Sequence, residues 1–202
     1  RLYELSFLAG LFPAENLESN LKKLIKTVKK PFIAVCRAAK EKGSFPGTEK
    51  QRMEMLALAV RAGAKLVDVG VHTNNHFVQV LKKICRKRKA KMIISQHIWD
   101  RTPPLSHLLK YIKKAKKLGA DIVKVATQVR NWSDNTVLFE LTARAQKMGQ
   151  KVIIIGMGEK GKISRIGCSL LGSFLTYVAL DQKSKTAPGQ LTIDENRSLK
   201  LF

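Results

Sequence analysis

A lysine and a histidine that end two apolar segments are the residues of this sequence best suited to chemistry. Lys124 lies in Ala-Asp-Ile-Val-Lys-Val-Ala, and His97 ends Ile-Ile-Ser-Gln-His. A lysine within a β-branched run is predicted to be buried, and burial favours the neutral amine, which can form an imine with a carbonyl group. If the two segments are neighbouring parallel strands, the amine and the imidazole meet over one cavity. That pair is suited to imine chemistry with acid–base assistance.

The scaffold that would position these residues is predicted from an alternation of β-rich and helical segments. We expect seven strands, at residues 2–8, 32–37, 66–71, 91–96, 121–126, 152–157 and 174–179. Gly63, Gly119 and Gly149 each suit the left-handed position after a helix and before a strand. The alternation predicts an α/β fold with a parallel sheet, in one domain spanning residues 1–202.

Two architectures fit this pattern, an eight-stranded (β/α)8 TIM barrel and a doubly wound sheet. No Gly-x-Gly-x-x-Gly follows the first strand, which weakens the dinucleotide-binding interpretation of a doubly wound sheet. If the fold is the barrel, one strand is still to be found. It is expected either before Arg1, with the first βα unit missing from this chain, or at a place the pattern does not reveal.

The charge balance is unusual, because 38 Lys and Arg residues face 15 Asp and Glu residues, a net charge of +23. Nucleic acid, an anionic membrane or acidic substrates would each account for such a charge, and so would solvated helix faces or deliberate charge engineering. No apolar run reaches the length of a membrane span and no signal peptide is evident, so we expect a cytoplasmic protein without a membrane partner. The three cysteines, Cys36, Cys85 and Cys168, are expected to be reduced structural thiols.

In either architecture the chemistry gathers at the carboxyl ends of the strands. One amine, one imidazole, one carboxylate and two guanidinium groups are expected at that edge, together with a methionine, a threonine and a glutamine: Arg37, Glu41, His97, Lys124, Met157, Arg165, Thr186 and Gln190. Arginine suits a carboxylate and lysine suits a ketone, so the set predicts an anionic carbonyl substrate. His72, His76 and His107 share no spacing with acids that suggests a metal, and we expect them at the surface.

Six motifs in order resemble those of the type I 3-dehydroquinate dehydratases. They are Cys-Arg-Ala-Ala-Lys-Glu from Cys36, Ile-Ser-x-His ending at His97, Val-Lys-Val-Ala around Lys124, Met-Gly-x-x-Gly-x-x-Ser-Arg from Met157, Gly-Ser-Phe-Leu-Thr-Tyr from Gly172, and Ala-Pro-Gly-Gln ending at Gln190. The resemblance implies a (β/α)8 barrel, a homodimer, and an enzyme of the shikimate pathway without metal or organic cofactor.

The resemblance also implies a role for each site residue. Lys124 would form the imine with the C3 ketone of 3-dehydroquinate, and His97 would remove a C2 proton and then protonate the leaving C1 hydroxyl. Glu41 would orient His97. The substrate would be held by the remaining residues, with Arg165 on its carboxylate: Arg37, Glu4, Met157, Arg165, Thr186 and Gln190.

The sequence departs from the family pattern at several positions. A Glu-x-Arg-x-Asp signature of the family is here Glu4, Ser6 and Leu8, and Lys42 follows Glu41 where the family has glycine. Several changes remove acids or add cations, as in a redesigned or repurposed chain, and together the departures predict impaired activity. Two alternatives therefore stay open: a related Schiff-base barrel with another substrate or no activity, and a cationic scaffold or assembly subunit that binds nucleic acid.

Overall fold

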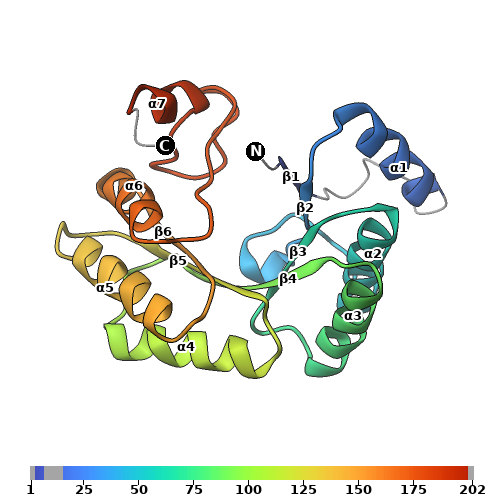
Figure 1. Cartoon of the computed structure of the whole chain (residues 1–202), viewed down its shortest axis with the longest axis horizontal. Coiled ribbons are helices and arrows are strands. Elements are labelled where there is room, and N and C mark those ends of the chain that lie inside the picture. The colour runs from blue at the N-terminus through green and yellow to red at the C-terminus, as the bar shows by residue number, and fades with distance from the viewer. Residues whose placement is uncertain (1–2, 7–15, 200–202) are drawn as a thin grey trace. The chain divides into compact units, whose positions relative to one another are not determined.

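The structure is a computed structural model of the 202-residue chain, and it describes residues 3–6 and 16–199. Two compact units make up the chain. The first comprises residues 1–95 and 115–121, and the second comprises residues 96–114 and 122–202. Each unit is built from strands that alternate with helices (Figure 1).

The first unit contains a parallel sheet whose strand order follows the chain order. Its elements are β1 (Tyr3–Ser6), α1 (Leu17–Val28), β2 (Phe32–Val35), the 3-10 turn η2 (Ala39–Glu41), α2 (Glu49–Ala62), β3 (Leu66–Gly70), α3 (Asn75–Lys87) and the first part of β4 (Lys91–Ile98). Parallel ladders join β1 to β2, β2 to β3 and β3 to β4. Helix α2 begins with a capping box in which Thr48 and Gln51 satisfy each other's backbone amides.

The second unit is built around a parallel β5–β6 pair. It contains most of α4 (Leu105–Lys117), β5 (Ile122–Gln128), α5 (Asp134–Lys147), β6 (Val152–Met157), the 3-10 turn η3 (Glu159–Gly161), α6 (Lys162–Leu170) and α7 (Ile193–Ser198). Lys124 pairs with Ile153 in the ladder, and Gln128 pairs with Met157. Since side chains alternate along a strand, Lys124 and Met157 project from the same face of this pair, with Met157 nearer its carboxyl end.

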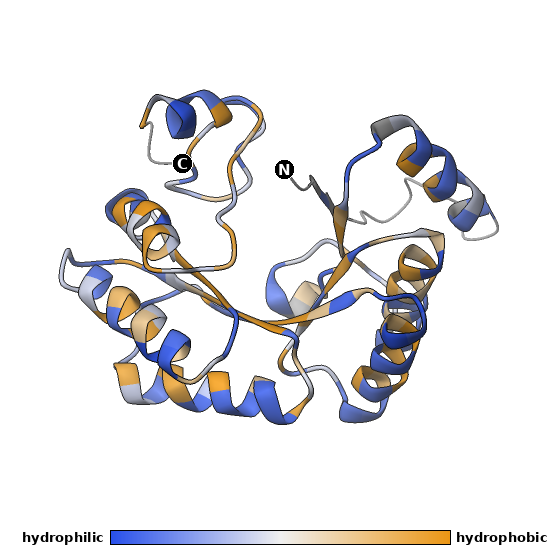
Figure 2. Cartoon of the chain, viewed as in Figure 1, coloured by the Kyte–Doolittle hydropathy of each residue, from blue (hydrophilic) through white to orange (hydrophobic). Residues whose placement is uncertain are grey.

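Most strand residues are apolar and buried on both faces, as a parallel sheet covered by helices requires. Figure 2 shows the apolar strands and the mixed colouring of the surrounding helices, which have one apolar side. Gly63, Gly119 and Gly149 all have positive φ, which confirms the prediction that they end helices.

The expected strand at residues 174–179 is wrong. Only an isolated bridge between Ala179 and Thr192 forms there, so six strands are present in the described part of the chain, not seven. The Ser173 hydroxyl accepts a hydrogen bond from the Ile154 amide at 3.2 Å and thus occupies a position that a seventh strand would need. The Phe174 amide donates to the Val152 carbonyl at 2.7 Å, and no ladder with β6 follows in this described segment.

Candidate active site

Lys124 is buried in the second unit, at 5% exposure, on the face of β5 that also carries Ala126 and Gln128. Its Nζ atom lies 4.4 Å from the centre of the Tyr177 ring. The sequence pattern placed Tyr177 in a strand and did not reveal this contact. Because residues 174–178 are irregular, the chain can fold the tyrosine ring over the end of the lysine side chain.

His97 is half-buried near the carboxyl end of β4, in the part of that strand that belongs to the second unit. Its ring stacks on Trp99, with centroids 5.6 Å apart and planes inclined by 17°. The chain then reaches Thr102, whose hydroxyl lies 2.9 Å from that of Thr127 and donates to the Gln128 carbonyl at 3.0 Å. These bonds hold the segment after His97 against the carboxyl end of the strand that carries Lys124.

Arg165 lies in the first turn of α6 and is 3% exposed. Its Nη2 donates to the Pro188 carbonyl at 3.4 Å, and its Nε is buried without a hydrogen-bond partner. Burial lowers the pKa of Arg165 well below its ordinary value, to about 10. A buried guanidinium with an unused donor is suited to an anion that arrives from outside, above all a carboxylate.

The segment from Thr186 to Gln190 is fixed beside the end of β6. The Gly158 amide donates to the Pro188 carbonyl at 3.1 Å, and a side chain at Gly189 would overlap the Gly158 carbonyl. Gly189 also has φ of 73°, which favours glycine. The side-chain oxygen of the buried Gln190 accepts hydrogen bonds from the Thr186 amide and hydroxyl at 2.9 and 3.2 Å. The two residues predicted to bind substrate are therefore hydrogen-bonded to each other.

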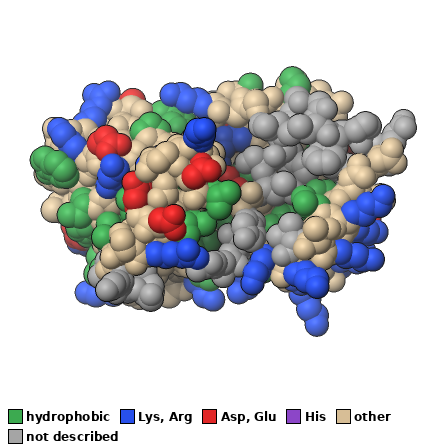
Figure 3. Space-filling model, turned by 90° about the horizontal axis from the view of Figure 1, so that it is seen from above, with side chains coloured by type: hydrophobic (Ala, Val, Ile, Leu, Met, Phe, Trp, Pro, Cys, Tyr) green, Lys and Arg blue, Asp and Glu red, His purple; other side chains and the backbone are tan. Residues whose placement is uncertain are grey.

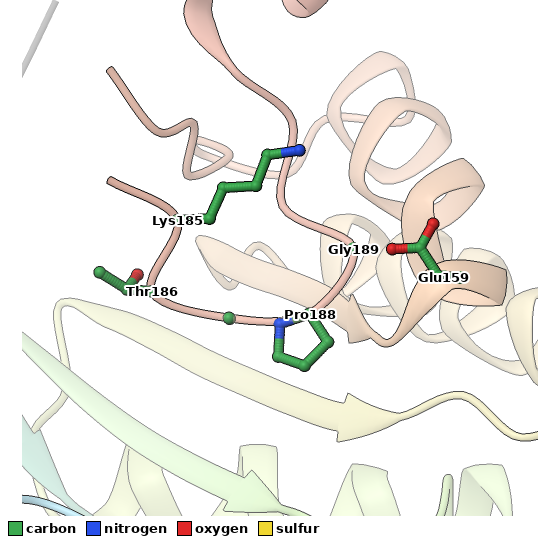
Figure 4. Close-up of a pocket in the computed structure, with 6 residues that line it drawn as sticks. Glu159, Lys185, Thr186, Pro188 and Gly189 are labelled. Atoms are coloured by element: carbon green, nitrogen blue, oxygen red, sulfur yellow. The ribbon is translucent and has the colours of Figure 1, made fainter. Parts of the chain in front are cut away.

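A hollow of about 350 Å³ lies at this segment, lined by Glu159, Lys185, Thr186, Ala187, Pro188 and Gly189 (Figure 4). The Gly189 amide hydrogen-bonds to the Glu159 carboxylate, which contributes to the lowered pKa of that acid, although Lys162 is the larger cause. Of the predicted site residues only Thr186 lines this hollow. We therefore do not assign it to the chemistry of Lys124.

The remaining predicted residues, Glu4, Arg37 and Glu41, belong to the first unit. Arg37 follows β2 and lies 4.0 Å from the buried Asp68 on β3, measured from Nη2 to Oδ2. Glu41 ends η2, and a side chain at Gly70 would overlap its carboxylate. Gly70 on β3 therefore leaves the space that Glu41 occupies, a relation that the sequence pattern alone did not reveal.

The departures from the family pattern lie in the same unit. Lys42 adopts a left-handed conformation with φ of 58° and is exposed. Glu4 is exposed on β1. Ser6 ends β1, while Leu8 lies outside the described residues.

No group of three metal-binding side chains occurs in the described part of the chain, and His72, His76 and His107 are exposed as predicted. No described helix combines the length and apolar character that a membrane crossing would need.

The parallel strands that alternate with helices define an α/β protein of the (β/α)-barrel kind, with fewer strands in the described residues than the eight of a full barrel. Comparison with solved structures supports this fold. A 3-dehydroquinate dehydratase from Geobacillus kaustophilus superposes with a TM-score of 0.84 at 28% identity, over 92% of this chain and 72% of that one. A type I enzyme from Clostridium difficile gives a TM-score of 0.86 at 24% identity, over 97% and 80%.

The sequence comparisons identify the family. The profile of the type I 3-dehydroquinases matches residues 5–200. A 3-dehydroquinate dehydratase from Desulfotalea psychrophila is 34% identical over 175 residues, which are 87% of this chain and 77% of that protein. The chain belongs to the type I 3-dehydroquinase family.

Proposed function

We propose that this protein dehydrates 3-dehydroquinate to 3-dehydroshikimate through an imine on Lys124. The observation that supports the proposal most directly is the burial of this lysine on β5, in the unit that also buries the Arg165 guanidinium. An amine and an anion-binding group are the two features that an anionic keto acid requires.

The proposed reaction begins when the Lys124 amine adds to the C3 ketone and water leaves, which forms the imine. The imine draws electrons from C2, so His97 can take a C2 proton as a general base. The same imidazole then returns a proton to the C1 hydroxyl, which departs as water while the C1–C2 double bond forms. Hydrolysis of the imine releases the product and restores the amine, so the net change is the loss of one water.

Substrate binding is assigned to groups around this centre. Arg165 would form a charge-assisted pair with the substrate carboxylate, using the donor that has no partner within the described protein. Met157 would pack against the ring, since it projects from the same face of the β5–β6 pair as Lys124. Hydroxyl or carboxylate contacts from Thr186, Gln190, Arg37 and Glu4, and the orientation of His97 by Glu41, stay predictions, as do the homodimer and the cytoplasmic location.

Trapping the imine tests the proposal. Sodium borohydride added during turnover of 3-dehydroquinate should reduce the imine and add the ligand mass to the peptide that contains Lys124. The Lys124→Met variant should gain no mass and show no turnover. The His97→Ala variant should still trap an adduct, while the formation of dehydroshikimate, followed by ultraviolet absorbance, falls by about 10²–10⁴-fold. Turnover by the wild type without an adduct on Lys124 would refute the imine.

A second candidate, an impaired or redirected member of the family, is favoured by the residues at positions 6 and 8. We propose that Ser6 and Leu8 lower activity because an arginine and an aspartate of the family signature are absent. Restoring both with Ser6→Arg and Leu8→Asp should raise kcat/KM for 3-dehydroquinate. An unchanged value would separate these positions from the reaction and leave the imine chemistry unaffected.

A further inference from the structure

A dense group of cations lies at the carboxyl end of α3 in the first unit. Residues 82–91 contain Lys82, Lys83, Arg86, Lys87, Arg88, Lys89 and Lys91 and no acidic residue. The first of these is buried and ion-paired to Asp121, at 2.6 Å between Nζ and Oδ2. The other six are exposed. The group is therefore a surface feature and not part of the core.

Cations from neighbouring elements of the same unit extend this group. The Lys91 amide donates to the Lys65 carbonyl at 2.9 Å, so Lys65, which precedes β3, lies beside Lys91, which begins β4. The side chain of Gln79 on α3 donates to the Leu118 carbonyl at 3.3 Å, just after Lys116 and Lys117. We call the combined set the basic surface: Arg61, Lys65, Lys83, Arg86, Lys87, Arg88, Lys89, Lys91, Lys116 and Lys117.

The stability of the fold does not account for the whole basic surface. Cations near helix ends are favourable by about 0.3–1 kcal/mol each, but Lys83 and Lys87 are four residues apart on α3, where like charges repel. The pKa of Glu18 is lowered chiefly by Lys22, with which it forms an ion pair at 2.7 Å, and only to a lesser degree by Arg61 and Arg88. Asp121 is engaged by Lys82. The described acids of this unit therefore leave most of the basic surface without a neutralising partner.

The side chains around the basic surface identify the kind of anion it fits. No Phe, Tyr or Trp whose side chain is described is exposed in the first unit, so bases have no platform for stacking. The exposed large apolar residues described there are Leu24 and Val80, too few to insert into a lipid surface. Figure 3 shows Lys and Arg side chains along much of the outline of one face, on its left side as well as on its right.

We propose that the basic surface binds the phosphate backbone of double-stranded nucleic acid without reading its sequence. Ammonium and guanidinium groups neutralise phosphates and release counterions, and this interaction needs neither aromatic nor apolar contacts. The surface lies at the amino ends of β3 and β4 and includes none of the residues proposed for the dehydratase reaction. Binding of nucleic acid is thus independent of the proposed function.

Fluorescence anisotropy with a labelled DNA duplex of mixed sequence tests this proposal. The logarithm of the affinity should fall linearly with the logarithm of salt concentration, by about 0.9 per phosphate contact. Replacing Lys83, Arg86, Lys87 and Arg88 with alanine should reduce the slope by about 3–4 and weaken binding at least tenfold at ~50 mM salt. Alanine favours helix, so the variant should fold, and its Tm verifies this. A glutamine set at the same positions serves as a second variant.

The matched control removes the same charge from the second unit, by alanine at the exposed Lys110, Lys113, Lys114 and Lys147. It should bind the duplex almost as the wild type does. Equal losses in the two variants would mean that net charge alone is responsible and would overturn the proposal. So would the absence of binding at ~50 mM salt, tighter binding to a single strand, or binding to phosphatidylserine vesicles without binding to duplex.

Discussion

Replacing Arg165 with methionine should raise the free energy of unfolding of the protein and lower its kcat/KM for 3-dehydroquinate. Burial lowers the pKa of this guanidinium well below its ordinary value, to about 10. A tenfold change in proton affinity corresponds to about 1.4 kcal/mol, so burying the charge costs about 3 kcal/mol. The unfolded chain keeps this proton to higher pH than the folded chain, so the cost is present in full at neutral pH and declines only above about pH 10.

The variant also loses the hydrogen bond from Nη2 to the Pro188 carbonyl, a long contact of 3.4 Å worth about 1 kcal/mol. Methionine fills much of the arginine volume without a charge. The net gain is about 2 kcal/mol, which for a chain of this size is a rise in Tm of about 4–8 °C. Loss of a charge-assisted bond of about 1.5–3 kcal/mol to the substrate carboxylate should lower kcat/KM by about 10–150-fold.

Differential scanning fluorimetry and steady-state kinetics on the same preparations measure both effects. The matched control is Arg144→Met, because Arg144 is exposed on α5 and pairs with Glu140 at 2.6 Å. Its stability should change by no more than about 0.5 kcal/mol, with kinetics unchanged. A lower Tm for Arg165→Met together with an unaltered KM would show that the protein itself satisfies the guanidinium, and the assignment of Arg165 to an external carboxylate would fail.

Three further perturbations test the local structure. Ser164→Ala should destabilise the protein by about 1–3 kcal/mol in urea denaturation, because the buried hydroxyl accepts from the Gly156 amide at 2.9 Å and donates to the Gly161 carbonyl at 2.7 Å. A change below that of Ser169→Ala, whose hydroxyl is partly buried, would contradict this. Lys29→Gly should stabilise by about 0.5–1 kcal/mol, because Lys29 ends α1 with φ of 52°, whereas Lys26→Gly inside the helix should destabilise by a similar amount. Burial raises the pKa of the thiols of Cys36, Cys85 and Cys168 to about 11. Iodoacetamide at pH 8 should therefore label the native protein far more slowly than the urea-unfolded chain, and the free energy of unfolding should fall as pH rises from 9 toward 11. Rapid labelling of the native protein would contradict the burial of these thiols.

Local patterns in the sequence predicted most of the elements. β-branched runs such as Val152–Met157 form strands, and glycines such as Gly119 end helices, because backbone conformation and burial are set within a few residues. The apolar run from Phe174 looked equally strand-like. This run does not form a ladder with β6, where the Ser173 hydroxyl instead accepts a hydrogen bond from the Ile154 amide. A contact between segments so far apart in the chain cannot be predicted from a local pattern.

The same distinction between local and distant contacts separates the predicted from the unpredicted parts of the candidate site. Residue type and strand position were enough to select Lys124 and Arg165, and both prove to be buried. The partners that modify them were not evident, because Tyr177 and Pro188 reach them from loops whose path depends on packing. The position of Glu41 likewise depends on a distant residue, because its carboxylate occupies the space that a side chain at Gly70 would fill. A sequence pattern therefore reveals the side chains proposed to react, whereas it does not reveal the residues that surround them. Substitutions at Gly70 and Tyr177 should accordingly change the rate of the proposed reaction although Lys124 and Arg165 are retained.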